Sequence, residues 1–231
     1  MVRAILEGRK TVTRRIVKGV RDDNNMVLKK ATKTRCGIIT HVIDAPKKGL
    51  CPYGNVGDRL WVKETWGAIT GTWDENDNLV DWNPDRPAQA IREMPYGNGY
   101  YTGHVIYRAD GEHEWAGDDD GYGEPRSAWK PSIHMPRAAS RIILEVTDVR
   151  VELLQDTTDS DAEAEGIERR VIGDGWREYG LDPRDEAAGT PPMLSARDSF
   201  RSLWESLNGA GSWEATPWVW RVEFKQIEVA A

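Results

Sequence analysis

Residues 5–15 read ILEGRKTVTRR, and this stretch sets how the chain begins to fold. Apolar residues at positions 1, 2, 5 and 6 predict a short helix that Gly8 ends in a left-handed cap. The β-branched residues of TVTRRIV, 11–17, then favour a strand. Four cationic side chains and two threonines of GRKTVTRR therefore lie where a helix gives way to a strand, a position at which side chains and backbone donors can converge on a ligand.

The positive charge of this stretch belongs to a basic N-terminal segment of an acidic chain. Residues 1–50 contain 13 Lys and Arg against four Asp and Glu, whereas the whole 231-residue chain has a net charge of -7. Such asymmetry indicates either a surface that faces a polyanion or basic and acidic segments that pack against each other. Composition leaves both interpretations open.

Composition predicts a globular, soluble protein in the cytoplasm. Hydrophobic residues make up 39% and charged residues 30%. No apolar run approaches the roughly 18 residues of a membrane span, and the N-terminal residues do not show the long apolar stretch of a secretory signal. Cys36 and Cys51 have no CxxC partner and the four histidines are dispersed. We therefore expect reduced thiols, no metal and no cofactor.

Alternating or β-branched patterns predict several strands. These cover 36–43, 57–67, 103–109 and two segments of 141–155 that are separated by a break at Thr147 and Asp148. The final pattern, WVWRVEFK at 218–225, predicts a half-buried strand with one apolar and one polar face.

Capping signals predict two further helices. One begins after Thr158 or Ser160 and has an acidic first turn; the other begins at the capping pair of Ser195 and Asp198 and stops before Gly209. The second helix carries a stripe that is typical of core packing, formed by Phe200, Leu203, Trp204 and Leu207.

The predicted fold class is α+β, a small, partly closed β-barrel with flanking helices. We expect a single domain over residues 1–231, with insertions at about 71–127 and 173–192. Residues 71–127 are poor in aliphatic residues and are interpreted as a long loop around one strand, without a second core.

Three segments in this order, ILEGRKTVTRR (5–15), VGDRLWVKETW (56–66) and WVWRVEFKQI (218–227), resemble the ASCH domain, a branch of the PUA-like superfamily. WKPSIHMPRAASRI (129–142) is similar to the larger versions that phages and prophages encode. The resemblance implies a PUA-like barrel, a nucleotide or nucleic-acid ligand and a cleft lined by the GRKTVTRR stretch. Relatives usually carry a strand before the first helix, so we expect this chain to lack that strand or to fill its position differently.

The resemblance also implies a catalytic set. In small ASCH hydrolases that remove the acetyl group from N4-acetylcytidine, a Lys, a Thr three positions later and a Glu on a later helix act together, and Lys10, Thr13 and Glu165 occupy the similar positions here. Thr13 would attack or position water, Lys10 would act as base, and Glu165 would orient Lys10 and carry the proton. We expect the Glu165 carboxylate within hydrogen-bond reach of Lys10 or Thr13, in a pocket touched by Trp61 or Trp66.

Further residues are candidates for ligand binding. Arg9, Arg14 and Arg15 could lower the pKa of Lys10 and donate to a phosphate or oxyanion. Two tryptophans could stack on a base or belong to the core, and two arginines could clamp a phosphate or pair with carboxylates. These are Trp61, Trp66, Arg137 and Arg141.

Two classes of function follow. The first is a metal-independent hydrolase that removes an acyl group from the exocyclic amine of a cytosine nucleoside or nucleic-acid base. The second is a non-catalytic nucleic-acid-binding module, and a ribonuclease is a weaker third. The expected partner is a modified nucleoside or nucleic acid, with RNA favoured over DNA, and the acyl group and the oligomeric state remain open.

Overall fold

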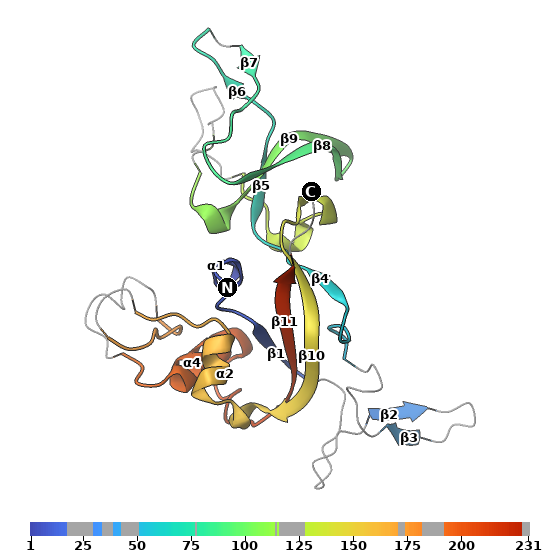
Figure 1. The fold of residues 1–231 in the computed structure, drawn as a ribbon, viewed down its shortest axis with the longest axis vertical. Helices are drawn as coiled ribbons and strands as arrows, with labels where there is room; N and C mark the ends of the chain where they lie inside the picture. The colour runs from blue at the N-terminus through green and yellow to red at the C-terminus, as the bar shows by residue number, and fades with distance from the viewer. Residues whose placement is uncertain are drawn as a thin grey trace. The chain divides into compact units, whose positions relative to one another are not determined.

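A computed structural model describes residues 1–17, 30–33, 39–42, 51–76, 78–113, 115, 128–170, 174–181 and 192–227. The fold is mixed α+β, mostly strands with few helices (Figure 1). The chain divides into two compact units. The first comprises Met1, Arg3–Leu60 and Leu144–Ile227, and the second comprises Val2 and Trp61–Ile143.

A four-stranded sheet curls into a half-barrel in the first unit (Figure 1). Its order is β1 (Val12–Ile16), β11 (Trp218–Ile227), β10 (Ile143–Leu153) and β4 (Arg59–Trp61). A separate pair is formed by β2 (Lys30–Lys33) and β3 (Ile39–Val42). β1 lies at the sheet edge and runs antiparallel to β11, which places Arg14 opposite Arg221.

Local capping determines the helices of this unit as predicted. They are α1 (Val2–Leu6), α2 (Asp159–Ala164) and α4 (Ala196–Asn208), with a 3-10 turn, η4, at Leu154–Asp156. Gly8 follows α1 with φ +72°, and the Ser195 hydroxyl accepts from the Asp198 amide. Thr158 and Asp161 form a reciprocal capping box at the start of α2.

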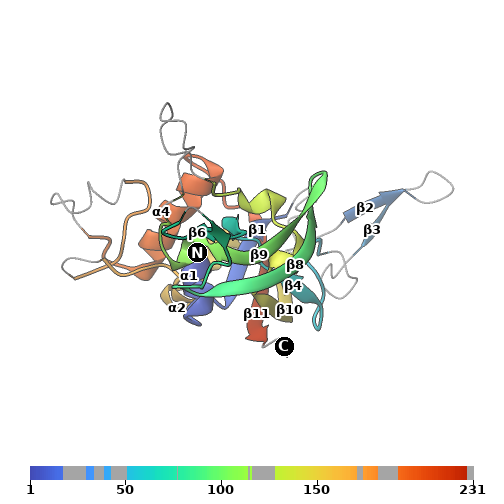
Figure 2. The ribbon, with the colours of Figure 1, turned by 90° about the horizontal axis from the view of Figure 1, so that it is seen from above.

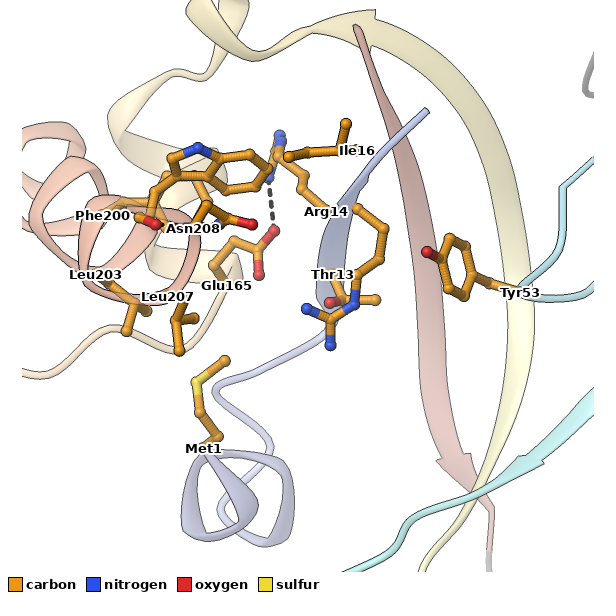
Figure 3. A pocket seen from close by; sticks show the side chains of 12 residues that line it. Met1, Thr13, Arg14, Ile16, Tyr53, Glu165, Phe200, Leu203, Leu207 and Asn208 are labelled. Carbon is orange, nitrogen blue, oxygen red and sulfur yellow. Dashed lines mark hydrogen bonds and ion pairs between the residues drawn. The ribbon is translucent and has the colours of Figure 1, made fainter. Parts of the chain in front are cut away.

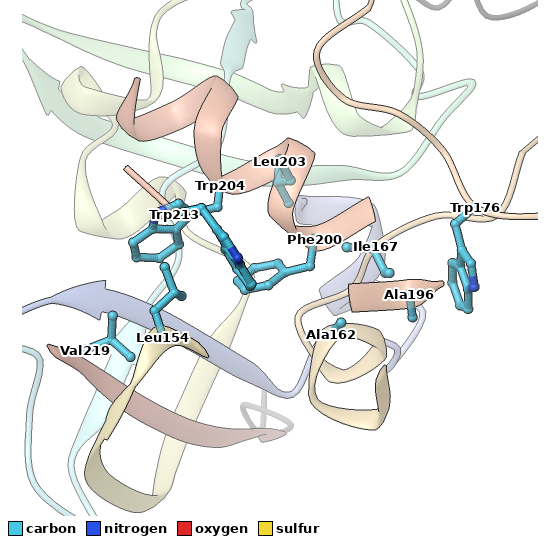
Figure 4. Packing of buried hydrophobic residues seen from close by; sticks show 10 residues of the cluster. All are labelled: Leu154, Ala162, Ile167, Trp176, Ala196, Phe200, Leu203, Trp204, Trp213 and Val219. Atoms are coloured by element: carbon cyan, nitrogen blue, oxygen red, sulfur yellow. The ribbon is translucent and has the colours of Figure 1, made fainter. Parts of the chain in front are cut away.

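The main core of the first unit lies between α2, α4 and the sheet (Figure 4). It consists of Leu154, Ala162, Ile167, Trp176, Ala196, Phe200, Leu203, Trp204, Trp213 and Val219. The interpretation of the α4 stripe as core is therefore right for its first three members. It is wrong for Leu207, which is 64% exposed because the last turn of α4 extends beyond the cluster.

The final strand is buried on both faces, so its interpretation as half-buried is wrong. Val219 packs under the helices, whereas Trp220 and Val222 join a second cluster with Cys51 and Val146. Both faces are buried because β11 is an inner strand, between β1 and β10, and a cluster of side chains packs on each of its faces. Cys51 is free and buried, as a reduced thiol would be, and Cys36 lies outside the described residues.

Two strand predictions need correction. β10 runs without interruption through Thr147 and Asp148, and it lies within the sheet, between the long strand β11 and the short strand β4. The segment 57–67 is not one strand but divides into β4 and β5 (Trp66–Ile69). None of the described helices is long and apolar enough to cross a membrane.

The second unit is built on a three-stranded antiparallel sheet in the order β5, β9 (Gly99–Tyr107) and β8 (Ala88–Tyr96). β8 and β9 form a curved ribbon (Figure 2). The remaining elements are a small hairpin of β6 (Thr72–Trp73) and β7 (Leu79–Val80) and the 3-10 turns η1 (Arg108–Asp110), η2 (Ser132–His134) and η3 (Arg137–Ala139).

The interpretation of 71–127 as a loop around one strand is therefore wrong. Tyr96 pairs with Gly99, so Gly97 and Asn98 form a two-residue hairpin turn, with Gly97 at φ +60°. This unit has its own cluster of buried residues, namely Trp66, Met94, Val105, Tyr107, Met135 and Ala139. In the other predicted insertion, 173–192, Trp176 bridges to Met193 and joins the core of the first unit.

We predict that Thr158→Ala lowers the free energy of unfolding by about 1 kcal/mol, because the first turn of α2 loses its hydroxyl acceptor. Thr158→Ser keeps an oxygen at the cap and should unfold close to wild type. Urea unfolding of the two variants checks the prediction, and equal destabilisation by both would contradict it.

Candidate functional site

Lys10 and Glu165, 155 positions apart, form a buried ion pair. Lys10 Nζ donates to Glu165 Oε2 at 2.7 Å, to the Glu165 carbonyl at 2.8 Å and to the Val12 carbonyl at 2.8 Å. The two residues are 6% and 2% exposed. The expected contact between Glu165 and Lys10 is thereby confirmed, and the three ammonium protons are all bound within the protein.

Backbone contacts bring the two partners together. Lys10 lies in the irregular segment between α1 and β1, where its amide donates to Ala4 and the Thr11 amide donates to Ala164 at the end of α2. Glu165 caps α2, and Gly166 follows with φ +80°. A Cβ on Gly166 would lie 2.7 Å from Lys10 Cβ, so this approach requires glycine. The sequence prediction missed Gly166, although a glycine after a helix is a recognisable signal.

Arg14 extends the pair into a cluster. Its side chain is fully buried and donates to Glu152 at 2.8 Å and to Glu165 Oε1 at 3.3 Å, while Nη2 lies 3.2 Å from Asp161. The Glu165 carboxylate is therefore held between two buried cations, Lys10 and Arg14.

Arg221 on β11 completes the cluster across the strand pair. Like charges opposite each other destabilise a sheet unless anions lie between them. Asp161 Oδ1 lies 3.2 Å from Arg14 and accepts from Arg221 at 3.1 Å, and Arg221 also donates to Glu223. Asp161 thus bridges the two arginines. Sequence reasoning missed Glu152, Asp161, Arg221 and Glu223 because these residues, from two strands and from α2, meet only in the tertiary structure.

Two groups of this cluster have altered proton affinities. Burial lowers the pKa of Lys10; Glu165 opposes this, and the charges of Arg15 and Arg14 add to it. Burial raises the pKa of Asp161, but its hydrogen bonds from Thr158 and the charges of Arg14 and Arg221 outweigh burial and lower the pKa to about 2. The cluster therefore favours the charged form of Asp161 and disfavours that of Lys10.

A pocket of about 170 Å³ opens along the edge strand β1 (Figure 3). Thr13 and Arg15 share one face of β1 and Arg14 lies on the other, and side chains from both faces line the pocket because β1 is an edge. Its lining residues are Met1, Thr13, Arg14, Arg15, Ile16, Tyr53, Glu165, Phe200, Leu203, Trp204, Leu207 and Asn208. Lys10 is not among them and reaches the pocket only through Glu165.

Thr13 and Arg15 are two lining groups with unused hydrogen-bonding capacity. The Thr13 hydroxyl forms no hydrogen bond with a described residue, and Arg15, which is exposed, has no ion pair with one. Arg9 differs, because it donates to Glu7 at 2.7 Å and lines another groove, of about 830 Å³, which also includes Thr11.

The remaining predicted ligand-binding residues belong to the second unit. Trp66 is fully buried in its core, so its ring has no exposed face on which a base could stack. Trp61 and Arg137 do come together, with the guanidinium 5.9 Å from the ring centroid, and Lys63 Nζ lies 5.0 Å from the same ring. The structure therefore gathers Lys10, Arg14, Arg15, Thr13 and Glu165 in the first unit, and a separate aromatic and cationic group in the second.

Arg141 is occupied by carboxylates. It makes paired hydrogen bonds to Glu64 at 3.0 and 3.1 Å and to Asp110 at 2.7 and 3.0 Å, and it stacks on Tyr107 at 3.9 Å. Of the two alternatives for this arginine, the carboxylate pairing is confirmed. Within the described ranges no three His, Cys, Asp or Glu side chains form a group that could hold a metal ion.

The chain matches no protein-family model, no curated protein and no solved structure. The resemblance to the ASCH domain therefore rests on the quoted motifs alone.

We predict that Gly166→Ala destabilises the protein more than Gly8→Ala. Both glycines have positive φ, so both substitutions carry a backbone cost of about 1 to 2 kcal/mol. A Cβ on Gly8 meets no atom within 4 Å, whereas one on Gly166 meets Lys10 and Ala4. Thermal unfolding of the two variants measures the difference, and equal losses would show that this close approach is not needed.

We predict that Asp161→Asn flattens the acid limb of the stability curve. The ordinary pKa is 3.8 and the folded value is about 2, so ionised Asp161 stabilises the fold above pH 4 and this contribution is lost as the pH falls through 2. It amounts to at most about 2 kcal/mol, because solvent screens the charge of this partly exposed carboxylate. Urea midpoints of wild type and variant between pH 2 and 6 check this, and parallel curves would contradict it.

Proposed function

We propose that the protein is an ASCH-type hydrolase with a PUA-like fold that removes an acyl group from the exocyclic amine of a cytosine nucleoside or nucleic-acid base, as in N4-acetylcytidine. The observation that carries the proposal is a shared pocket. A threonine hydroxyl without a partner among the described residues, Thr13, and a carboxylate held between two cations, Glu165, line the same small space.

The pocket supports amide hydrolysis in the following way. Thr13 Oγ1 attacks the acyl carbon and forms a C–O bond, while its proton passes to the Glu165 carboxylate. The C–N bond then breaks, and the proton moves from Glu165 to the departing exocyclic nitrogen. Water hydrolyses the resulting acyl-threonine ester, which releases the acid and restores the hydroxyl.

Lys10 acts in this scheme through Glu165 and not on the substrate, since it does not line the pocket. Its hydrogen bond to Oε2 fixes the carboxylate, and Arg14 fixes the other oxygen. Lys10 is therefore a positioning residue.

The volume of the pocket supports a small reacting group. Whole drug-sized ligands occupy cavities of about 300 to 1,000 Å³. The pocket here, at about 170 Å³, accommodates the acylated amine and part of a base, while the sugar stays outside. An enzyme that acts on a nucleoside and one that acts on a nucleotide in a polymer both satisfy this geometry.

One observation favours a second candidate, a nucleic-acid-binding module without turnover. Lys10 is buried and all three of its ammonium protons are bound by Glu165 and Val12, an arrangement that a purely structural ion pair also adopts. Thr13 distinguishes the two candidates. Its hydroxyl forms no hydrogen bond with a described residue, so its removal should affect chemistry more than the fold.

We predict that Thr13→Ala lowers the rate of release of cytidine from N4-acetylcytidine by at least about 100-fold without changing the unfolding midpoint. Thr11→Ala is the matched control, since Thr11 is an exposed threonine two positions away that lines the other groove. Chromatography of the nucleosides provides the rate, and thermal unfolding reports the fold.

The outcomes distinguish the two candidates. Turnover by wild type and Thr11→Ala but not by Thr13→Ala supports the hydrolase. Turnover that survives Thr13→Ala removes the threonine from the chemistry. No turnover by the wild-type protein across a series of N4-acylated cytidines would reject the hydrolase and leave the binding module.

A further inference from the structure

Arg15 differs in its surroundings from the other cations of the GRKTVTRR stretch. Arg9 is paired with Glu7, Lys10 with Glu165, and Arg14 with three carboxylates. Arg15 is exposed, lines the pocket and has no ion pair with a described residue. In a chain with a net charge of -7, an exposed arginine that has no counter-ion among the described residues is a local centre of positive potential beside the pocket.

Two exposed apolar side chains lie beside Arg15 at the pocket. Leu207 is 64% exposed and Met1 is 50% exposed, and both line the pocket. Apolar side chains next to an exposed guanidinium suit a ligand that combines a flat, weakly polar ring with an anionic group. A nucleotide has this combination, whereas a free nucleoside lacks the anion.

We infer that the pocket takes a phosphorylated ligand, a cytidine nucleotide or a nucleotide residue of RNA, and that Arg15 binds its phosphate. Arginine suits this role because its planar guanidinium donates two parallel hydrogen bonds to phosphate oxygens. The inference rests on the proposed function for the identity of the base, but the phosphate contact requires no turnover.

Arg14 takes no part in this contact. Its side chain is fully buried and its charge is balanced by Glu152, Asp161 and Glu165. Moving it to a phosphate would leave buried carboxylates uncompensated. The specificity for phosphate therefore depends on Arg15, and the neighbouring arginine supports the fold.

The test compares the binding of cytidine, cytidine 5′-monophosphate and a short oligocytidine RNA to the full chain by titration calorimetry at low salt. Wild type is expected to bind the monophosphate or the RNA at least about tenfold more tightly than cytidine, the size of one charge-assisted contact. Arg15→Gln should abolish this preference and leave cytidine binding unchanged. Arg9→Gln removes the same charge from an exposed arginine six positions earlier, which lines the other groove, and this variant should keep the preference for the phosphorylated ligands.

The two phosphorylated ligands distinguish the source of the phosphate. A preference for the monophosphate alone assigns a mononucleotide, and a preference for the RNA assigns a phosphodiester. Equal binding of cytidine and both phosphorylated ligands, no measurable binding of any, or an equal loss in Arg9→Gln would overturn the inference. A phosphate preference that depends on Arg15 in a protein without turnover would reject the hydrolase while the phosphate contact stands.

Discussion

The carboxylate of Glu165, buried between Lys10 and Arg14, is the interaction on which the first unit depends. Buried charges are tolerated only when each is paired and hydrogen-bonded, and removing one partner costs about 3 to 5 kcal/mol. Lys10 precedes β1, Arg14 lies within it and Glu165 ends α2, so these three segments must be in place together. Glu152 on β10 pairs with Arg14 and lies near Arg221 on β11, so the ion pairs of this cluster also join the two long strands.

The cluster also explains why an acidic protein has a basic beginning. Of the two interpretations of the charge asymmetry, the packing of basic against acidic segments accounts for two residues of the stretch, Lys10 and Arg14. Lys10 and Arg14 are neutralised inside the protein by carboxylates from later in the chain, so two of the four cations of GRKTVTRR support folding. Arg15 keeps its charge available, because strand alternation turns it away from Arg14 and from the buried carboxylates. One strand thus carries a buried, ion-paired cation and an exposed cation at adjacent positions.

The second unit is stabilised by a core and by ion pairs of its own. Its sheet packs on its own cluster of buried residues, and the pairing of Arg141 with Glu64 and Asp110 uses the charges internally. Sequence reasoning underestimated this unit because polar residues reduce the aliphatic content of β8 and glycine and tyrosine reduce that of β9. Gly97 and Asn98 are turn residues of a hairpin and not part of an unstructured loop. Tyrosine and methionine fill the core positions that aliphatic residues usually occupy, as Tyr107 and Met94 do.

The sequence by itself determined the features that depend on neighbours in the chain. The caps at Gly8, Thr158 and Ser195 were predictable because each is made within a few residues, and the Lys10–Glu165 contact was expected from the resemblance. Only the tertiary structure decided which residues surround that contact. Arg221 faces Arg14 because of the β1–β11 register, and both faces of β11 are buried because packing covers each side. Such relations join residues far apart in the chain, and a one-residue shift in register would change them all.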